Sequence, residues 1–234
     1  MQLVGSDYVL KQQKTRWITN GSIATHALLI ISSTDNQKEV VTVIPLDQPG
    51  ISRSNPVSKM GLRALNQCEL FLEDVKIPEA SVISAEGIRA RALESLHGCV
   101  GQIAVGLAQS AFDESIAYAN DRIQGGVPII RHDNIKLKLF NMYTMIESSR
   151  AFARSLVPYN QADRIVPSLK RAIALRAIAS QAALTVTSEA VQIFGGPGLM
   201  KAYPVEKMLR DAGSLMTVNG TNHALALMAQ HDPQ

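Results

Sequence analysis

The hydrophobic pattern of this chain changes once, near Gly87. Before this point, short runs rich in β-branched and aromatic residues alternate with turn formers, and the runs are Tyr8–Leu10, Thr15–Thr19, Ala27–Ile31, Val40–Ile44 and Glu69–Leu72. Short runs with this spacing favour an antiparallel sandwich or barrel. After Gly87, apolar residues recur at steps of three and four, as one face of a helix requires. We therefore expect an α+β protein, with a β-sandwich or barrel domain at residues 1–84 and a helical domain at residues 85–234.

Three long helical patterns are visible in the second part. The first runs from about residue 87, the second from about Ile129 to Pro158, and the third from near Pro167 to Gly195. Shorter helices are expected after Pro204 and after Asn219, so the sequence predicts a four-helix bundle. The first helix contains glycines 98, 101 and 106, which weaken a helix by about 1 kcal/mol each relative to alanine. Close approach of another helix or of a flat ligand would explain them.

Composition excludes several classes of protein. The formal net charge is +3, with 46% hydrophobic and 18% charged residues, which suits a soluble globular protein and not a nucleic-acid binder. The two cysteines, Cys68 and Cys99, are far apart and predict neither a disulfide framework nor a metal site. The first residues do not form a signal peptide and no apolar run is long enough to span a membrane, so we expect a cytoplasmic protein.

The most informative motif lies near the C-terminus, at residues 203–212 and 218–221. It reads YPVEKMLRDA and then VNGT. It resembles the segment of flavin-dependent acyl-CoA dehydrogenases that reads Y-P-V-E-K-x-x-R-D-A followed by E-G-T. Other segments resemble the same family in order and spacing, and they are Tyr8–Leu10, Lys14–Gly21, Lys59–Arg63, Leu70–Pro78, Ala104–Gln109 and Ala190–Gly196.

The resemblance covers nearly the whole chain and implies the middle β-domain and the C-terminal helical domain of that family. The family's N-terminal helical domain has no counterpart here, so we expect either a fragment or a partner chain that supplies it. The resemblance further implies FAD as cofactor, an acyl-CoA thioester as substrate, a role in fatty acid metabolism, and a homodimer or homotetramer formed through the bundle.

The resemblance also assigns cofactor contacts. Trp17 would stack on the flavin, and Thr19, two residues later with Ile18 between them, would hydrogen-bond the flavin ring system. The alternative for Trp17 is an aromatic residue in the core next to a strand. Gln192, Gly195 and Gly196 would receive the FAD pyrophosphate, although Gly195 alone could be a helix C-cap.

Three further contacts are implied at positions where the motif is altered or ambiguous. Arg122 would reach the FAD of a neighbouring subunit, but the family's R-K-x-F-G becomes RIQGG, which loses the phenylalanine. Thr221 and His223 would lie near the diphosphate and adenosine, with Thr221 as a helix cap as the alternative.

Catalysis is where this sequence departs from the family. The glutamate of E-G-T is the base in many members, and Asn219 holds its position here; an amide cannot accept the proton as a carboxylate does. A second branch of the family places its base on the first long helix, at the position of Leu96. The nearest carboxylate is Glu94, which is otherwise a solvated residue of a helix start, and His97 is a further polar candidate. Glu206 and Asp211 are expected to form structural ion pairs.

Three functions therefore stay open. The first is α,β-dehydrogenation of an acyl-CoA by a flavoprotein oxidoreductase. The second is another flavin reaction on the same fold, such as that of a monooxygenase or desulfinase, which needs no α-proton base. The third is a catalytically inactive partner subunit.

Overall fold

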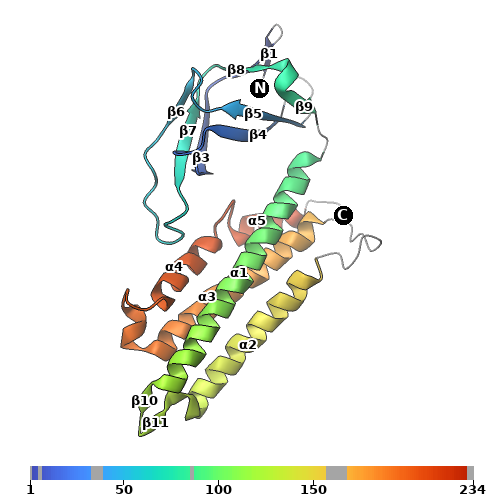
Figure 1. Ribbon diagram of the computed structural model, residues 1–234. Helices are drawn as coiled ribbons and strands as arrows, with labels where there is room; N and C mark the ends of the chain where they lie inside the picture. Colours follow the sequence, from blue (N-terminus) through green and yellow to red (C-terminus); the bar gives the residue numbers. More distant parts are fainter. Residues whose placement is uncertain (1, 5–6, 33–38, 85–86, 157–167, 231–234) are drawn as a thin grey trace. The chain divides into compact units, whose positions relative to one another are not determined.

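The computed structural model describes residues 2–4, 7–32, 39–84, 87–156 and 168–230. These residues form two compact units, Met1–Ala92 and Leu93–Gln234. The first is built from strands and the second from helices, as Figure 1 shows. The α+β class expected from the sequence is confirmed. Pro158 and Pro167, which bound two of the expected helices, lie outside the described residues.

The β unit contains three small antiparallel sheets. Their strand orders are β1-β2-β8, β3-β7-β6 and β4-β5-β9. The strands are β1 (Gln2–Val4), β2 (Asp7–Leu10), β3 (Gln13–Thr19), β4 (His26–Ser32), β5 (Glu39–Pro45), β6 (Ile51–Arg53), β7 (Gln67–Leu72), β8 (Val75–Pro78) and β9 (Val82–Ser84), with a 3-10 turn at Glu79–Ser81. All these pairings are antiparallel.

Alternation along the strands builds the core of this unit. In β7 every second side chain is buried, as expected for a strand with one face against a core. Two clusters result, one of Leu10, Ile44, Leu72, Val75 and Ile77, the other of Leu46, Cys68 and Leu70. Cys68 is therefore a buried core residue, and Cys99 is an exposed free thiol.

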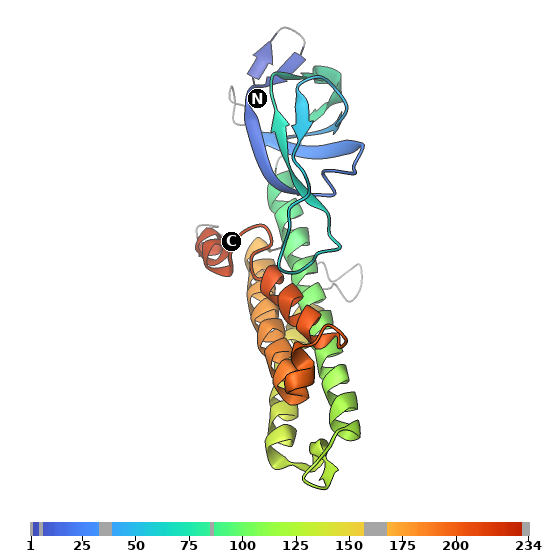
Figure 2. The ribbon, with the colours of Figure 1, turned by 90° about the vertical axis from the view of Figure 1, so that its left-hand side faces the viewer.

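The helical unit is organised around α3. The helices are α1 (Ile88–Asp121), α2 (Asp133–Arg154), α3 (Leu169–Phe194), α4 (Val205–Leu215) and α5 (Asn222–Gln230). Figures 1 and 2 show α1, α2, α3 and α4 side by side as a bundle, and α5 also packs on α3. Because α3 has neighbours on several sides, it buries alanine, valine and isoleucine side chains around most of its circumference.

Short elements complete the ends of the helices. A two-residue hairpin, β10 (Ile123–Gln124) and β11 (Val127–Pro128), follows α1, and the 3-10 turn η2 (Ile129–Arg131) leads into α2. The 3-10 turn η3 (Gly196–Leu199) follows α3. Ser168 caps α3, because its side-chain oxygen accepts a hydrogen bond from the amide of Arg171.

The three glycines of α1 do not share one explanation. A Cβ built on Gly101 would lie 2.7 Å from Cγ of Leu175 and 3.2 Å from the backbone nitrogen of Arg176, so α1 and α3 approach closely there. A Cβ on Gly98 or Gly106 would meet nothing within 4 Å. Of these three glycines, Gly101 is thus the one that helix packing requires among the described residues.

These surroundings predict opposite effects of alanine at two glycines of the same helix. Gly101→Ala should lower the free energy of unfolding by about 1–3 kcal/mol, because α1 and α3 must move apart. Gly106→Ala should raise it by up to about 1 kcal/mol, since alanine restricts the unfolded chain and meets open space. Urea unfolding followed by circular dichroism measures both, and equal shifts for the two variants would contradict the packing described.

Candidate functional site

The helical unit has a pocket of about 720 Å³ at one end of the bundle. Its walls come from the end of α1, the β10–β11 turn, the start of α2 and the end of α3 with the glycine turn that follows. Four of the predicted cofactor residues line it, namely Arg122, Gln192, Gly195 and Gly196. Residues separated by some 70 positions in the sequence are thus brought to one cavity.

The glycine turn presents bare backbone to this pocket. Gly195 has φ of 65°, and its N–H donates to the carbonyl oxygen of Val191 at 3.0 Å, so it ends α3. A Cβ on Gly195 or Gly196 would meet nothing within 4 Å, which leaves room for a ligand against the main chain. The C-cap and the open surface expected from the sequence are therefore both present at this turn.

An aromatic pair supports the turn from behind. The rings of Tyr118 and Phe194 stack with centroids 4.0 Å apart and planes 15° apart. The Tyr118 hydroxyl donates to the carbonyl oxygen of Phe194 at 3.2 Å. The ring of Tyr203 meets both rings edge-on. The start of the glycine turn is consequently fixed to α1 by packing and by one hydrogen bond.

The opposite wall carries the basic residues. Arg122 is exposed, and none of the ion pairs found among the described residues involves it. The hairpin that follows turns at Gly125 and Gly126, with φ of 66° and 82°. His132 Nε2 lies 3.0 Å from the carbonyl oxygen of Gln124, so this nitrogen carries a hydrogen and donates it. Gly125 stands where the family has phenylalanine. A Cβ built on Gly125 would lie 3.6 Å from Cε1 of His132, so the missing side chain leaves open space beside the His132 ring.

In the β unit, Trp17 lies on a distorted part of β3. The register between β3 and β7 shifts between Thr15 and Ile18, which marks a bulge. Trp17 has φ of 60°, a rare conformation for a bulky residue, and its side chain is 60% exposed. The core position that was the alternative for this aromatic ring is therefore wrong.

The neighbours of Trp17 point in different directions. The side chain of Ile18 packs against the cluster around Cys68, so its contact with any ligand would be through the backbone. Thr19 is exposed. Gln67 Nε2 donates to the carbonyl oxygen of Trp17 at 3.5 Å.

The turn between α4 and α5 carries the remaining predicted contacts. Asn219 is exposed and has φ of 53°. The side chain of Thr221 accepts a hydrogen bond from the amide of Ala224 at 3.3 Å, so Thr221 caps α5. His223 is exposed in the first turn of α5. None of these three lines the pocket at the other end of the bundle.

The candidates at the start of α1 differ in burial. Glu94 is half-buried, Leu96 is 38% exposed and His97 is fully buried. Burial, together with the charge of Arg176, lowers the pKa of His97 to about 4. His97 is thus neutral at physiological pH.

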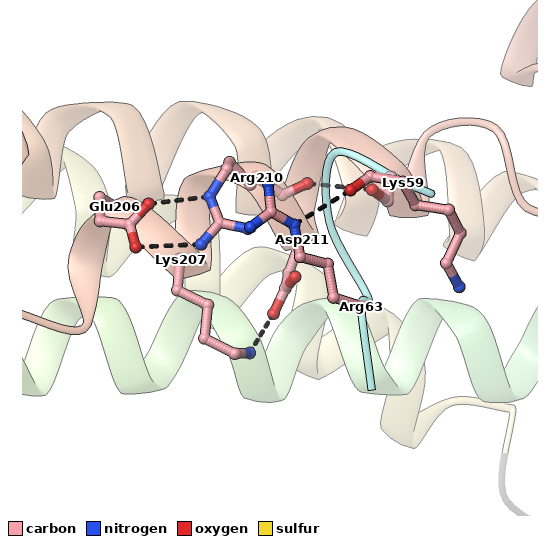
Figure 3. A network of polar contacts seen from close by, with 7 residues as sticks. Lys59, Arg63, Glu206, Lys207, Arg210 and Asp211 are labelled. Atoms are coloured by element: carbon pink, nitrogen blue, oxygen red, sulfur yellow. Dashed lines mark hydrogen bonds and ion pairs between the residues drawn. The ribbon is translucent and has the colours of Figure 1, made fainter. Parts of the chain in front are cut away.

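The two carboxylates of the YPVEKMLRDA motif, Glu206 and Asp211, form ion pairs on α4 (Figure 3). Arg210 forms a two-pronged pair with Glu206, with Nε to Oε2 at 2.8 Å and Nη2 to Oε1 at 3.0 Å. Lys207 pairs with Asp211. Both carboxylates therefore take part in ion pairs within the helix that carries them.

Sequence reasoning missed Tyr118 and Arg176 as site residues. Tyr118 lines the pocket, and its place next to Phe194 was not signalled by spacing. His132 and Asp133 stand where the family resemblance has a His-Gln pair, and both line the pocket. Arg176 is fully buried, and its position on the strongly apolar α3 was the available signal. Within the described residues no group of histidine, cysteine, aspartate or glutamate could hold a metal ion, and no helix is long and apolar enough to cross a membrane.

Comparisons with known proteins agree with this architecture. Residues 89–230 match the family model for the C-terminal domain of acyl-CoA dehydrogenase, and residues 1–75 match the model for its middle domain. The probable acyl-CoA dehydrogenase YngJ of Bacillus subtilis is 35% identical over 233 residues, which cover 96% of this chain and 60% of that protein.

Solved structures give the same result. Butyryl-CoA dehydrogenase from Megasphaera elsdenii superposes with a TM-score of 0.88 at 27% identity, covering 98% of this chain and 61% of that one. A glutaryl-CoA dehydrogenase from Mycobacterium smegmatis, solved in complex with FADH2, shares the fold with a TM-score of 0.87 at 23% identity, covering 97% and 58%. The chain thus spans about 60% of the length of these relatives. From the matches to its two units, the chain belongs to the acyl-CoA dehydrogenase family.

Proposed function

We propose that this chain is the FAD-binding part of an oxidoreductase that acts on an acyl-CoA thioester. The observation that carries the proposal is the pocket that gathers Arg122, Gln192, Gly195 and Gly196. Related proteins are named as acyl-CoA dehydrogenases, and one of them was solved with FADH2.

The chemistry of the pocket fits the diphosphate of a dinucleotide. An exposed guanidinium offers several donors to phosphate oxygens. The two glycines leave space in which those oxygens can approach backbone N–H groups. Asp133 also lines the pocket, and its carboxylate pairs with Lys136 at 2.9 Å, which reduces its repulsion of an anion.

The β unit offers a separate argument for a flat aromatic ligand. An exposed indole on a strained backbone is typical of a binding surface, because such strain persists only where the surrounding structure enforces it. We therefore assign Trp17 to stacking on the flavin ring and Thr19 to hydrogen bonding with it, as the family resemblance implies. Each unit supports the proposal by its own residues.

Dehydrogenation needs a base for the proton α to the thioester carbonyl, and this chain lacks the usual one. When bound, FAD would supply the acceptor for the β-hydrogen as hydride. Asn219 can donate or accept a hydrogen bond but cannot take up the proton. Among the residues weighed from the sequence, Glu94 is the carboxylate that remains without a structural ion pair in the described part of the chain. We therefore infer slow dehydrogenation, with Glu94 as the candidate substitute base.

Asn219 also favours a second candidate function. A flavin reaction with oxygen requires no α-proton base, so asparagine in place of glutamate would not slow that reaction. Oxygen consumption by the reduced protein would favour this reaction over dehydrogenation. A chain without turnover that co-purifies with a longer flavoprotein would instead be a partner subunit.

We further propose that the bundle associates with a second copy into a homodimer or homotetramer. Three large apolar side chains of α2 are exposed at steps of three residues, namely Leu137, Phe140 and Tyr143, with exposed fractions of 61%, 62% and 49%. Such a stripe on one helix face is typical of a protein interface.

A large side chain that occupies the pocket tests whether flavin binds there. Gly196→Leu should weaken FAD binding about 10- to 100-fold, the loss expected when hydrogen bonds to a charged group are removed. The full chain is titrated with FAD and followed by flavin fluorescence. Gly106→Leu is the matched control, because both glycines face open space and lack positive φ.

The control should bind FAD like the unchanged chain. Equal affinities for all three proteins would contradict the assignment of the pocket. A well-folded chain that stays colourless in excess FAD would contradict the proposed function itself. Bleaching of the flavin bands when an acyl-CoA is added without oxygen would identify dehydrogenation.

A further inference from the structure

Arg176 lies inside the helical unit, near the start of α3. Its side chain is fully buried, and no carboxylate among the described residues forms an ion pair with it. Its Nη2 donates to the carbonyl oxygen of Gly220 at 2.7 Å and to that of Met216 at 3.5 Å. Both carbonyls belong to the turn between α4 and α5, so a buried cation holds this turn against the core.

A second contact lies one helical turn further along α3. Ser180 is fully buried, and its hydroxyl oxygen accepts a hydrogen bond from Nδ2 of Asn222 at 3.0 Å. Residues four apart share one face of a helix. The same face of α3 therefore contacts residue 216 before Asn219 and residues 220 and 222 after it.

His97 of α1 orients the guanidinium. Arg176 Nη1 lies 3.3 Å from His97 Nδ1, and a guanidinium can only donate, so Nδ1 is the acceptor and Nε2 carries the hydrogen. That Nε2 is buried and has no hydrogen-bond partner among the described residues. Among the described residues, the His97 imidazole thus hydrogen-bonds to Arg176 alone.

Stability alone does not explain this cluster. Burying a guanidinium without a carboxylate is unfavourable, and an apolar side chain of similar volume would avoid that penalty. Arg176 and Ser180 instead both contact residues 216–222, a segment that contains Asn219. The buried cluster is explained by the segment that it holds in place, which is the turn between α4 and α5.

We propose that Arg176 and Ser180 are positioning residues that fix the conformation of residues 217–221. The importance of this turn for the reaction rests on the proposed function, but the conformational role does not. Asn219 at φ of 53° and Gly220 at φ of 115° are the backbone that the two residues hold.

Hydrogen exchange of the full chain, followed by mass spectrometry, tests this role without any flavin. Ser180→Ala and Arg176→Met should speed exchange of the amides at 217–221 about tenfold or more, while the middle of α3 is unchanged. Arg176→Lys should restore part of the protection, because its ammonium can still donate to the Gly220 carbonyl. The matched control is Ser188→Ala, an exposed serine of the same helix.

A second readout separates this role from general loosening. ADP binding to the pocket at Gln192 should stay unchanged, since 16 residues of helix place it about 24 Å from Arg176. Exchange at 217–221 equal to that of the control would overturn the proposal, as would faster exchange throughout α3. If Arg176→Met does not fold, Ser180→Ala decides. Failure of the chain to bind FAD would contradict the proposed function and not this result.

Discussion

Replacing Asn219 by glutamate should raise the rate of acyl-CoA dehydrogenation by about 10²–10⁴-fold, the contribution of a well-placed general base. The substitution supplies a carboxylate at the position where the family resemblance places the base. Residue 219 has φ of 53°, which asparagine tolerates better than glutamate, so a stability cost of about 1 kcal/mol should accompany the gain. Single-turnover bleaching of the bound flavin by an acyl-CoA measures the rate.

Asn219→Gln is the matched control. Glutamine has the same length and the same backbone cost as glutamate, but no carboxylate, so its rate should stay at that of the unchanged chain. Equal rates for the glutamate and glutamine variants would show that position 219 does not face the reacting carbon. The alignment of VNGT with E-G-T would then be in error.

Acidification should destabilise the helical unit through His97. The folded protein keeps this imidazole neutral down to a pKa of about 4, whereas the unfolded chain takes up the proton near its ordinary pKa of about 6.5. Because the unfolded state binds more protons between these values, stability is complete above the higher one and falls as the pH drops toward 4. The expected loss between pH 7 and pH 5 is about 2 kcal/mol from this group alone.

His97→Asn isolates this contribution. Asparagine can still accept the hydrogen bond from Arg176 but does not titrate in this range. Urea unfolding at pH 7 and pH 5 should therefore show that the variant loses about 2 kcal/mol less unfolding free energy than the unchanged protein. The carboxylates are common to both proteins, so their contribution cancels in the difference. If the two proteins lose equal stability, His97 is not held neutral.

The sequence predicted those parts of the fold that local patterns determine. Long amphipathic runs predicted the three long helices, and Gly195 marked the end of α3 correctly. The three-residue strands β6 and β9 were not predicted, because so short a segment is a strand only when a partner pairs with it. The bulge at Trp17 was hidden for the same reason, since it depends on the register with β7, some fifty residues later.

The residues of the candidate site also fall into those that the sequence predicted and those that it did not. Family motifs identified Arg122, Gln192, Gly195 and Gly196, which line one pocket, although their role in cofactor binding stays a prediction. Arg176 escaped notice because an arginine in a helix usually lies on the solvated face. Arg176 is buried because the α4–α5 turn, some forty residues further along the chain, packs against it. Non-local partners of this kind leave no periodic signal.

The distorted segment of β3 has a spectroscopic consequence. Trp17 is the single tryptophan of the chain, so indole emission originates in the β unit alone. Its wavelength and intensity report on whatever covers that ring. The protein thus carries an optical label at the place where a planar molecule is expected to bind.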